Sequence, residues 1–265
     1  MTDPIVKYAG GKRWALPALR PLVLSNLSRR YVEPFVGGAA LALSLSGPEY
    51  NVQVTVRDVE WDLIETYETC RYAPIAVARR LDEMGEEHTP ERYYEVRASD
   101  PLRPIDRAAR ILYLNKMGFN GLWRKNRSGR FNVPIGRGKV SSLPSTSDLL
   151  AFSRATRHWR IEQGDFEGAV KLAGEGDVVY ADPPYAGTFA YSSGFDADDR
   201  VRLRDSLDDA WERGSTVIAT DSEAALEVWS GGSWTIERVS EPRRVSAGAA
   251  GRLPAECLLM HRSHR

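Results

Sequence analysis

Short apolar runs separated by helical patterns are the feature that most limits what this chain folds into. The runs are mostly β-branched or aromatic, and they read as buried strands at residues 31–35, 52–57, 178–181, 216–219 and 257–260. Helical spacing predicts helices at residues 39–45, 199–211 and 224–228. Alternating strands and helices favour an α/β fold with a mostly parallel sheet.

The region from residue 61 to residue 150 has a different pattern. Helical periods at 63–72, 74–84 and 105–116 are followed by residues 118–144, the basic loop, which is rich in Gly, Arg and Asn and has no clear period. A length of 265 residues suits one domain with a large insertion, or two small domains. We therefore predict an α/β domain from residues 1–60 and 151–265, with a mostly helical insertion at 61–150. The Gly/Ala-rich stretch 246–252 predicts a loop.

The charges balance in total but are segregated along the chain. Lys plus Arg and Asp plus Glu each number 36, so the net charge of zero gives no sign of a nucleic-acid partner. Residues 116–139, however, contain seven basic side chains and no acidic one, which predicts a local positive face. No apolar run approaches the roughly 20 residues of a membrane span, and the N-terminus lacks a signal-peptide core. We expect a cytoplasmic protein without membrane contact.

Asp182-Pro183-Pro184-Tyr185 is the strongest chemical signal, because it directly follows the apolar run 178–181. In open parallel sheets, ligands bind at the carboxyl ends of the strands. The prolines restrict the backbone and lack N–H donors, so nearby carbonyls stay free as acceptors. A carboxylate with carbonyls suits an amino group, and the tyrosine offers a face for stacking a base. The alternative is an acidic strand end followed by a Pro-Pro turn.

Four weaker motifs suggest a small-molecule site, although each also reads as an ordinary turn or cap. Residues 35–39 (Phe-Val-Gly-Gly-Ala) predict a strand end, a glycine turn and a helix start that a ligand approaches closely. Asp58 follows at about the 20-residue separation at which an acid binds a ribose diol. Residues 7–12 place two glycines between lysines, which suits an anion or carboxylate. Residues 164–166 (Gly-Asp-Phe) set an acceptor beside an aromatic ring.

Within the basic loop, basic, amide and aromatic side chains alternate from Phe119 to Pro134. That mixture suits phosphate contacts, hydrogen bonds to base edges and stacking. A solvated basic loop is the alternative.

Taken together in this order, the motifs resemble the Dam-type (D12 class, alpha group) family of DNA adenine-N6 methyltransferases. The resemblance runs from about residue 5 to the region of Glu256. It implies a Rossmann-like methyltransferase sheet that uses S-adenosylmethionine, a target-recognition domain at 61–150, and duplex DNA as the substrate.

The resemblance also implies roles for individual residues. The cofactor would be bound by Tyr8, Lys12, Glu33, Phe35, Gly37, Asp58, Asp165, Phe166 and Asp182. The target adenine would be held by Asp182, Pro183, Pro184 and Tyr185. DNA contacts fall at Lys7, Phe119, Asn120, Leu122, Arg124 and Pro134, to which the basic loop adds Lys125, Asn126 and Arg137.

The DNA-contact positions look similar to those of members that methylate GATC, which suggests GATC as the target. Gly138 stands where such members carry an aromatic residue, and Trp123 and Lys125 also differ. Tyr8 stands where the family often has Trp, which keeps an aromatic face.

The implied chemistry requires the target nucleotide to leave the duplex, at a cost of a few kcal/mol. Tyr185 would stack the base, while Asp182 and the Pro183 carbonyl accept hydrogen bonds from its amino group and stabilise the developing charge. None of the four histidines forms a ligand pair with a carboxylate, which predicts no metal.

Other activities fit the residues less well or stay open as alternatives. Neither Cys70 nor Cys257 lies beside a proline, which argues against a cytosine-C5 methyltransferase. A protein-glutamine methyltransferase would carry Asn at position 182, and a dinucleotide-dependent oxidoreductase would carry the full glycine fingerprint. An RNA adenine methyltransferase, an inactive DNA-binding relative and a cognate restriction nuclease as partner stay open.

Overall fold

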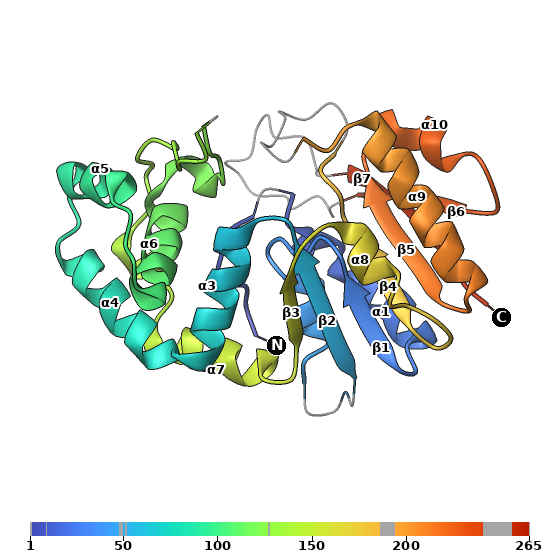
Figure 1. Cartoon of the computed structure of the whole chain (residues 1–265), viewed down its shortest axis with the longest axis horizontal. Coiled ribbons are helices and arrows are strands. Elements are labelled where there is room, and N and C mark those ends of the chain that lie inside the picture. Colours follow the sequence, from blue (N-terminus) through green and yellow to red (C-terminus); the bar gives the residue numbers. More distant parts are fainter. Residues whose placement is uncertain are drawn as a thin grey trace, which may run out of the picture.

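A computed structural model describes residues 2–8, 10–47, 50, 52–126, 128–185, 194–240 and 256–264. Its strands are β1 (Arg30–Glu33), β2 (Gln53–Asp58), β3 (Arg160–Gln163), β4 (Val178–Ala181), β5 (Thr216–Asp221), β6 (Thr235–Ser240) and β7 (Glu256–Arg262). They form one seven-stranded sheet in the order β3-β2-β1-β4-β5-β7-β6 (Figure 1). Neighbours from β3 to β5 are parallel, whereas β7 is antiparallel to both β5 and β6. The predicted mostly parallel α/β sheet is confirmed, although the apolar runs did not indicate β3 and β6.

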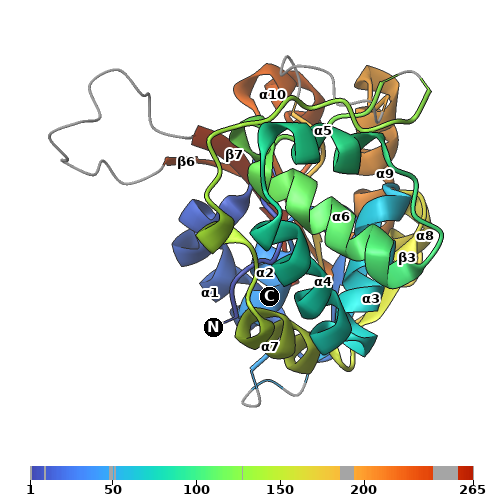
Figure 2. The same cartoon turned by 90° about the vertical axis from the view of Figure 1, so that its left-hand side faces the viewer.

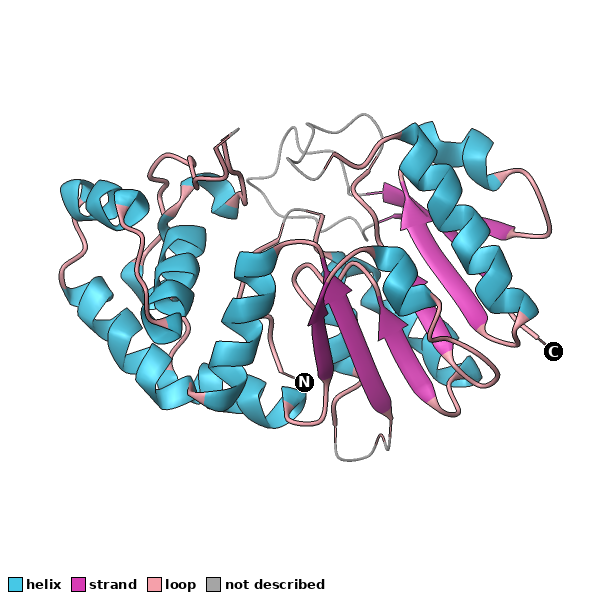
Figure 3. Ribbon diagram, in the orientation of Figure 1, coloured by secondary structure: helices cyan, strands magenta, loops and turns pink. Residues whose placement is uncertain are grey.

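Helices cover both faces of this sheet (Figure 3). On one face lie α1 (Leu16–Asn26), α2 (Ala40–Ser44) and α3 (Trp61–Tyr72), and on the other lie α8 (Phe166–Val170), α9 (Ala197–Glu212) and α10 (Leu226–Trp229). Tyr31 and Tyr180 enter the first core, while their chain neighbours Val32 and Val179 enter the second. This is the period of two expected of strands that are buried on both sides.

The remaining helices form the predicted helical region beside the β3 edge, which Figure 2 views face on. They are α4 (Pro74–Glu86), α5 (Pro90–Ala98), α6 (Pro104–Met117) and α7 (Thr146–Thr156), with short 3-10 turns between α6 and α7 at Phe119–Gly121 and Val140–Ser142. Two other 3-10 turns, Lys12–Ala15 and Glu223–Ala225, precede α1 and α10. Leu81, Tyr93 and Leu112 belong to the same core as Tyr31 and Tyr180, so this region packs continuously onto one sheet face. The domain boundaries at residues 61 and 150 stay a prediction.

The strand order reverses at the neighbouring strands β1 and β4, which bring two of the motifs together. The glycine turn follows β1 and the Asp-Pro-Pro-Tyr turn follows β4, so both lie at the carboxyl edge of the sheet. Crevices at such a reversal are the usual ligand sites of open α/β sheets. The predicted loop at 246–252 lies outside the described residues. Within the described ranges, no helix is both long enough and apolar enough to cross a membrane.

Candidate functional site

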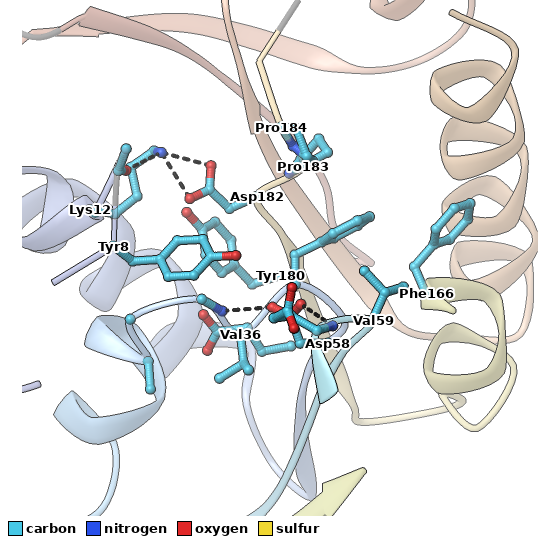
Figure 4. Close-up of a pocket in the computed structure, with 18 of the residues that line it drawn as sticks. Tyr8, Lys12, Val36, Asp58, Val59, Phe166, Tyr180, Asp182, Pro183 and Pro184 are labelled. Atoms are coloured by element: carbon cyan, nitrogen blue, oxygen red, sulfur yellow. Dashed lines mark hydrogen bonds and ion pairs between the residues drawn. The ribbon is translucent and has the colours of Figure 1, made fainter. Parts of the chain in front are cut away.

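A cavity of about 500 Å³ lies at the carboxyl ends of β1, β2 and β4, within the usual size range of small-molecule sites. It is lined by all nine residues predicted to bind a cofactor: Tyr8, Lys12, Glu33, Phe35, Gly37, Asp58, Asp165, Phe166 and Asp182. Pro183, Pro184 and Tyr185 complete the wall next to Asp182. Figure 4 shows Lys12 facing Asp182 at one end of the cavity, with Asp58, Val59 and Phe166 toward the other. The structure therefore brings the predicted residues together, while their binding roles stay predictions.

Tyr8 packs directly on the glycine turn. Gly37 has a φ of 41°, and a side chain there would come within 3.0 Å of the Tyr8 ring. The next residue, Gly38, is 3.4 Å from Tyr8 by the same measure. The absence of side chains at the two glycines thus lets the Tyr8 ring pack against the turn, where it forms part of the cavity wall.

Asp58 ties the glycine turn to the end of β2. One carboxylate oxygen accepts from the Gly37 N–H at 3.1 Å, and the other accepts from the Glu60 N–H at 3.0 Å. Burial raises the pKa of Asp58 to about 6, against the opposing effect of these backbone hydrogen bonds. Asp58 therefore acts as a turn cap and also lines the cavity, while its predicted role in binding a ribose stays a prediction.

Glu33 is buried at the end of β1, with only 4% of its surface exposed. The Tyr31 hydroxyl donates to its carboxylate at 2.9 Å. Burial raises the pKa of Glu33 to about 8, and the hydrogen bond from Tyr31 only partly offsets this. Burial therefore favours the protonated form of Glu33.

Asp182 is held on two sides and still faces the cavity. Lys12 Nζ lies 2.7 and 2.8 Å from its two carboxylate oxygens, and the Thr220 hydroxyl donates to it at 2.8 Å. The same ammonium lies 4.4 Å from the centre of the Tyr185 ring. Burial raises the pKa of Asp182, and the nearby Lys12 opposes that shift. The turn thus presents a carboxylate whose position is fixed before any ligand binds.

Aromatic rings form the other end of the cavity. Phe35 and Phe166 stack at a centroid distance of 5.5 Å, and Phe195 meets both rings edge-on at 5.6 and 6.1 Å. Asp165 caps α8 by accepting from the Glu167 N–H at 3.0 Å, and its side chain is 52% exposed. A flat apolar surface with an acceptor at its rim suits a heterocyclic base.

Asn115 joins the N-terminal segment to α6, and sequence reasoning missed it. Its side-chain amide accepts from the Lys7 N–H and donates to the Lys7 carbonyl, both at 2.7 Å. Lys7 also packs against the basic loop, since a side chain at Gly121 would come within 2.7 Å of it. The signal was present in the sequence: Asn115 is a polar residue on the apolar stripe of 105–116, and it is fully buried.

The predicted DNA-contact residues all lie outside the cavity, and most are exposed. The exposed ones are Lys7, Phe119, Asn120, Arg124, Asn126, Pro134 and Arg137, whereas Leu122 and Lys125 are half-buried. Arg124 Nε donates to the Asn132 side chain at 2.7 Å, which orients an otherwise exposed guanidinium.

Lys125 and Asn126 have partners within the protein. Lys125 forms ion pairs with Glu60 and, at 2.8 Å, with Asp62. The Asn126 side chain accepts from the Ser128 and Arg130 N–H groups at 3.1 and 3.0 Å. These contacts shape the basic loop and fasten it to the start of α3.

Two residues that differ from the family pattern have clear structural settings. Trp123 is only 4% exposed, lines the cavity and lies 6.3 Å from the Tyr8 ring. A side chain at Gly138 would come within 2.2 Å of the Lys116 carbonyl oxygen. An aromatic residue therefore does not fit at position 138 without a shift of the backbone.

In the part of the chain that the structure describes, no three His, Cys, Asp or Glu side chains gather as a metal site. Cys70 and Cys257 are buried free thiols. Burial raises the pKa of both.

Comparisons with known proteins add independent findings. The family model described as D12 class N6 adenine-specific DNA methyltransferase matches residues 8–241. The type II methyltransferase M1.LlaDCHI of Lactococcus lactis subsp. cremoris is 33% identical over 264 residues, covering 94% of this chain and 91% of its own. The DNA adenine methylase of Escherichia coli K12 is 29% identical over 236 residues, covering 83% and 81%. Among solved structures, the rRNA methyltransferase aviRa of Streptomyces viridochromogenes aligns over 93% of this chain and 82% of its own, at 16% identity and a TM-score of 0.44.

Proposed function

Because the chain belongs to the family of D12 class N6 adenine-specific DNA methyltransferases, we propose that its cavity binds the methyl donor and that the turn from Asp182 to Tyr185 holds the target adenine. The protein is an adenine-specific DNA methyltransferase, and S-adenosylmethionine is its cofactor. One observation carries the assignment of the site: the nine predicted cofactor residues line a single cavity whose wall continues into the acidic turn.

The residues present fit S-adenosylmethionine. The cofactor is a cation with a ribose diol and an adenine ring, and the acidic side chains of Glu33, Asp58 and Asp182 line the cavity. We assign the ribose to Asp58, which lies at the end of β2. The cofactor adenine is assigned to Asp165 and Phe166, and Tyr8 and Lys12 line the remaining part. When bound, the cofactor supplies an activated methyl group.

The acidic turn, Asp182 to Tyr185, binds and orients the target adenine. The target adenine leaves the duplex, because its amino group is inaccessible within the stack. Tyr185 stacks the base, and the Asp182 carboxylate and the Pro183 carbonyl oxygen accept hydrogen bonds from the amino group. These acceptors stabilise the positive charge that develops on nitrogen. Since Lys12 and Thr220 already hold Asp182, little reorganisation is needed at the moment of reaction.

We propose that direct DNA contacts come from the exposed or half-buried side chains Lys7, Phe119, Asn120, Leu122, Arg124, Pro134 and Arg137. Lys125 and Asn126 contribute by shaping the basic loop through their contacts within the protein. GATC is the proposed target, on the resemblance of these positions to members that methylate it. An aromatic side chain does not fit at Gly138 without a shift of the backbone, so this position differs from the members that methylate GATC. An experiment must therefore identify the methylated sequence as well as the methylated base.

Two further proposals concern the setting of the enzyme. We place the enzyme in the cytoplasm, because a DNA methyltransferase of this family acts where the DNA lies. The Lactococcus relative is a type II methyltransferase, which supports a cognate restriction nuclease as a functional partner of this chain.

The proposal is tested by expressing the chain in a host without DNA methylation and sequencing the plasmid with a method that detects modified bases. We expect N6-methyladenine at GATC, and none when Asp182→Ala is expressed. Methylation confined to a different adenine-containing sequence would replace the GATC assignment and leave the site intact. Duplex DNA left unmodified, with RNA methylated instead, would overturn the proposed function.

A further inference from the structure

The end of β5 runs beside the acidic turn. Ala219 of β5 is the register partner of Ala181 of β4, so the next residues, Thr220 and Asp221, continue alongside the start of the turn. Successive side chains on a strand point to opposite faces of the sheet. Thr220 lies on the face of Tyr180, whose hydroxyl is 3.0 Å away, and it binds Asp182 from that side. Asp221 therefore points to the opposite side of the same turn.

On that opposite side, Asp221 binds an arginine from the first turn of α9. Asp221 is fully buried and accepts from Arg200 Nε at 2.7 Å. Its other oxygen accepts from the Ser222 N–H at 2.8 Å, and the Trp229 indole N–H lies 3.4 Å from the first. Arg200 is itself only 5% exposed. The orientation of the guanidinium is therefore fixed by a carboxylate that is also fixed.

Arg200 uses a second nitrogen to bind the turn. Its Nη2 donates to the Pro184 carbonyl oxygen at 2.5 Å. The remaining nitrogen, Nη1, lies 3.4 Å from the Asp196 carbonyl oxygen, and the guanidinium lies 5.2 Å from the centre of the Phe195 ring. The planar fork of arginine allows one side chain to serve a carboxylate and a carbonyl at the same time.

The turn is therefore hydrogen-bonded from both faces of the sheet. Thr220 binds Asp182 on one face, and Arg200 binds the Pro184 carbonyl on the other. Pro183 lies between these points, and its carbonyl is a proposed acceptor for the target amine. A buried ion pair is weak evidence of a gain in stability, because well-packed apolar replacements are often neutral or stabilising. Because Arg200 also binds the Pro184 carbonyl oxygen, the ion pair with Asp221 can fix the position of the acidic turn.

We propose that Arg200, oriented by Asp221, is a positioning residue for methyl transfer. It fixes the Pro184 carbonyl and thereby the orientation of the Pro183 carbonyl toward the target amine. The inference rests on the proposed role of the acidic turn. A displacement of about 1 Å at a reacting group can lower a rate by on the order of 10²-fold, so loss of this contact should act on the chemical step.

The test uses three variants of the full chain. Arg200→Met with Asp221→Asn removes the ion pair from both sides, so that no charge is left buried without a partner, and Asn retains an acceptor for the Ser222 N–H. Arg200→Lys keeps a positive charge near Asp221 but lacks the fork that reaches two acceptors. Arg204→Met is the matched control: Arg204 also lies on α9 and donates to a backbone carbonyl, that of Val228, and it pairs with Asp205 away from the turn.

For each variant we would measure the thermal midpoint, the affinity for S-adenosylmethionine and the single-turnover rate of methyl transfer to a saturating duplex. A duplex with 2-aminopurine at the target position reports extrusion of the base by its fluorescence. We expect cofactor affinity and the fluorescence increase to stay within about twofold of wild type in all variants. The single-turnover rate should fall by about 10- to 100-fold in the double variant, by less in Arg200→Lys, and not in Arg204→Met.

A folded double variant with the wild-type rate would overturn the proposal, and so would rates that follow the thermal midpoints across all three variants. If the double variant does not fold, Arg200→Lys decides: a wild-type rate overturns the proposal and a reduced rate at normal cofactor affinity supports it. The wild-type reaction distinguishes failure of the role proposed for Arg200 from failure of the proposed function. The proposed function fails if the wild-type protein itself transfers no methyl group to adenine.

Discussion

The cofactor cavity and the basic loop (residues 118–144) differ in how their side chains are held. In the cavity, Glu33 and Asp58 are buried and hydrogen-bonded by the protein, and Asp182 is fixed by an ion pair and a threonine. In the basic loop, Phe119 is 49% exposed, and Arg124 is exposed and hydrogen-bonded to Asn132. The acidic side chains of the cavity thus have partners within the protein, whereas the exposed side chains of the loop have proposed partners on DNA.

This difference separates the two parts of the function. Reaction type depends on groups that the fold positions in advance, because preorganised acceptors are what stabilise developing charge. Target choice depends on exposed side chains that meet base edges and phosphates only in the complex. Substitutions in the cavity should therefore change rate or cofactor affinity, and substitutions in the loop should change discrimination between sequences.

The sharpest separation is expected for Asp182→Ala. Loss of an acceptor at the developing charge should lower the rate of methyl transfer by about 10²- to 10³-fold or more, while duplex affinity stays within about twofold. Radiolabelled methyl transfer and a fluorescence binding assay measure the two quantities. Asp205→Ala, which removes an exposed ion pair with Arg204, is the control and should behave as wild type. Substantial activity of Asp182→Ala would contradict the proposed role of Asp182 in methyl transfer.

The buried state of Glu33 predicts a pH effect on stability. The folded protein keeps a proton on Glu33 up to about pH 8, whereas the unfolded chain loses it above about pH 4.5. The free energy of unfolding should therefore decrease between these pH values and then level off. Glu33→Gln should remove the part of that decrease that comes from Glu33, whereas the raised pKa values of Asp58 and Asp182 still contribute theirs. The variant should therefore be more stable than wild type above pH 8 by on the order of a few kcal/mol. Urea unfolding at several pH values measures this, and parallel curves for the two proteins would contradict it.

Asp58→Ala tests the cofactor half of the cavity. Removing hydrogen bonds to a charged acceptor typically costs about 1.5–3 kcal/mol, so the KM for S-adenosylmethionine should rise by about 10- to 100-fold. Affinity for duplex DNA should change little, because Asp58 is buried and is not among the proposed DNA contacts. Calorimetric titration of the cofactor gives the same comparison without turnover. An unchanged cofactor affinity would remove Asp58 from the proposed site.

The smallest effects are expected within the basic loop, from the neighbours Arg124 and Lys125. Arg124→Ala should lower the ratio of cognate to non-cognate binding by about tenfold, as expected for loss of one base contact. Lys125→Ala should leave that ratio and the salt dependence of binding nearly unchanged, because Lys125 is paired with Glu60 and Asp62. If Lys125→Ala instead reduced the salt slope by about one, a phosphate contact by Lys125 would be indicated.

The fold could be predicted from the sequence wherever a strand or helix is buried. β4, for example, is buried at every position and its apolar run gave its bounds directly. β3 and β6 were missed because they are mostly exposed edge segments: β3 has one buried residue, and β6 has none. An apolar run is a signal of burial, so it weakens at the edges of a sheet.

The cavity was predictable in its motifs but not in its supports. Asp182 and Asp58 stand out because an acid at a strand end is uncommon in an apolar context. Thr220 and Arg200 do not, since a threonine in a strand and an arginine in a helix carry no signal by themselves. Their contacts with the acidic turn arise only when β5 and α9 pack beside it. The partners of Lys125 are equally non-local in sequence.

A structure of the protein with S-adenosylhomocysteine and a duplex that contains its methylation site would show whether the acidic turn holds the target adenine. We expect the extruded adenine to lie against the Tyr185 ring, with its amino group within hydrogen-bond distance of Asp182 and the Pro183 carbonyl. The donor would lie across Asp58 and Phe166. A target base bound elsewhere, with Asp182 still closed against Lys12 and no space between them, would contradict it.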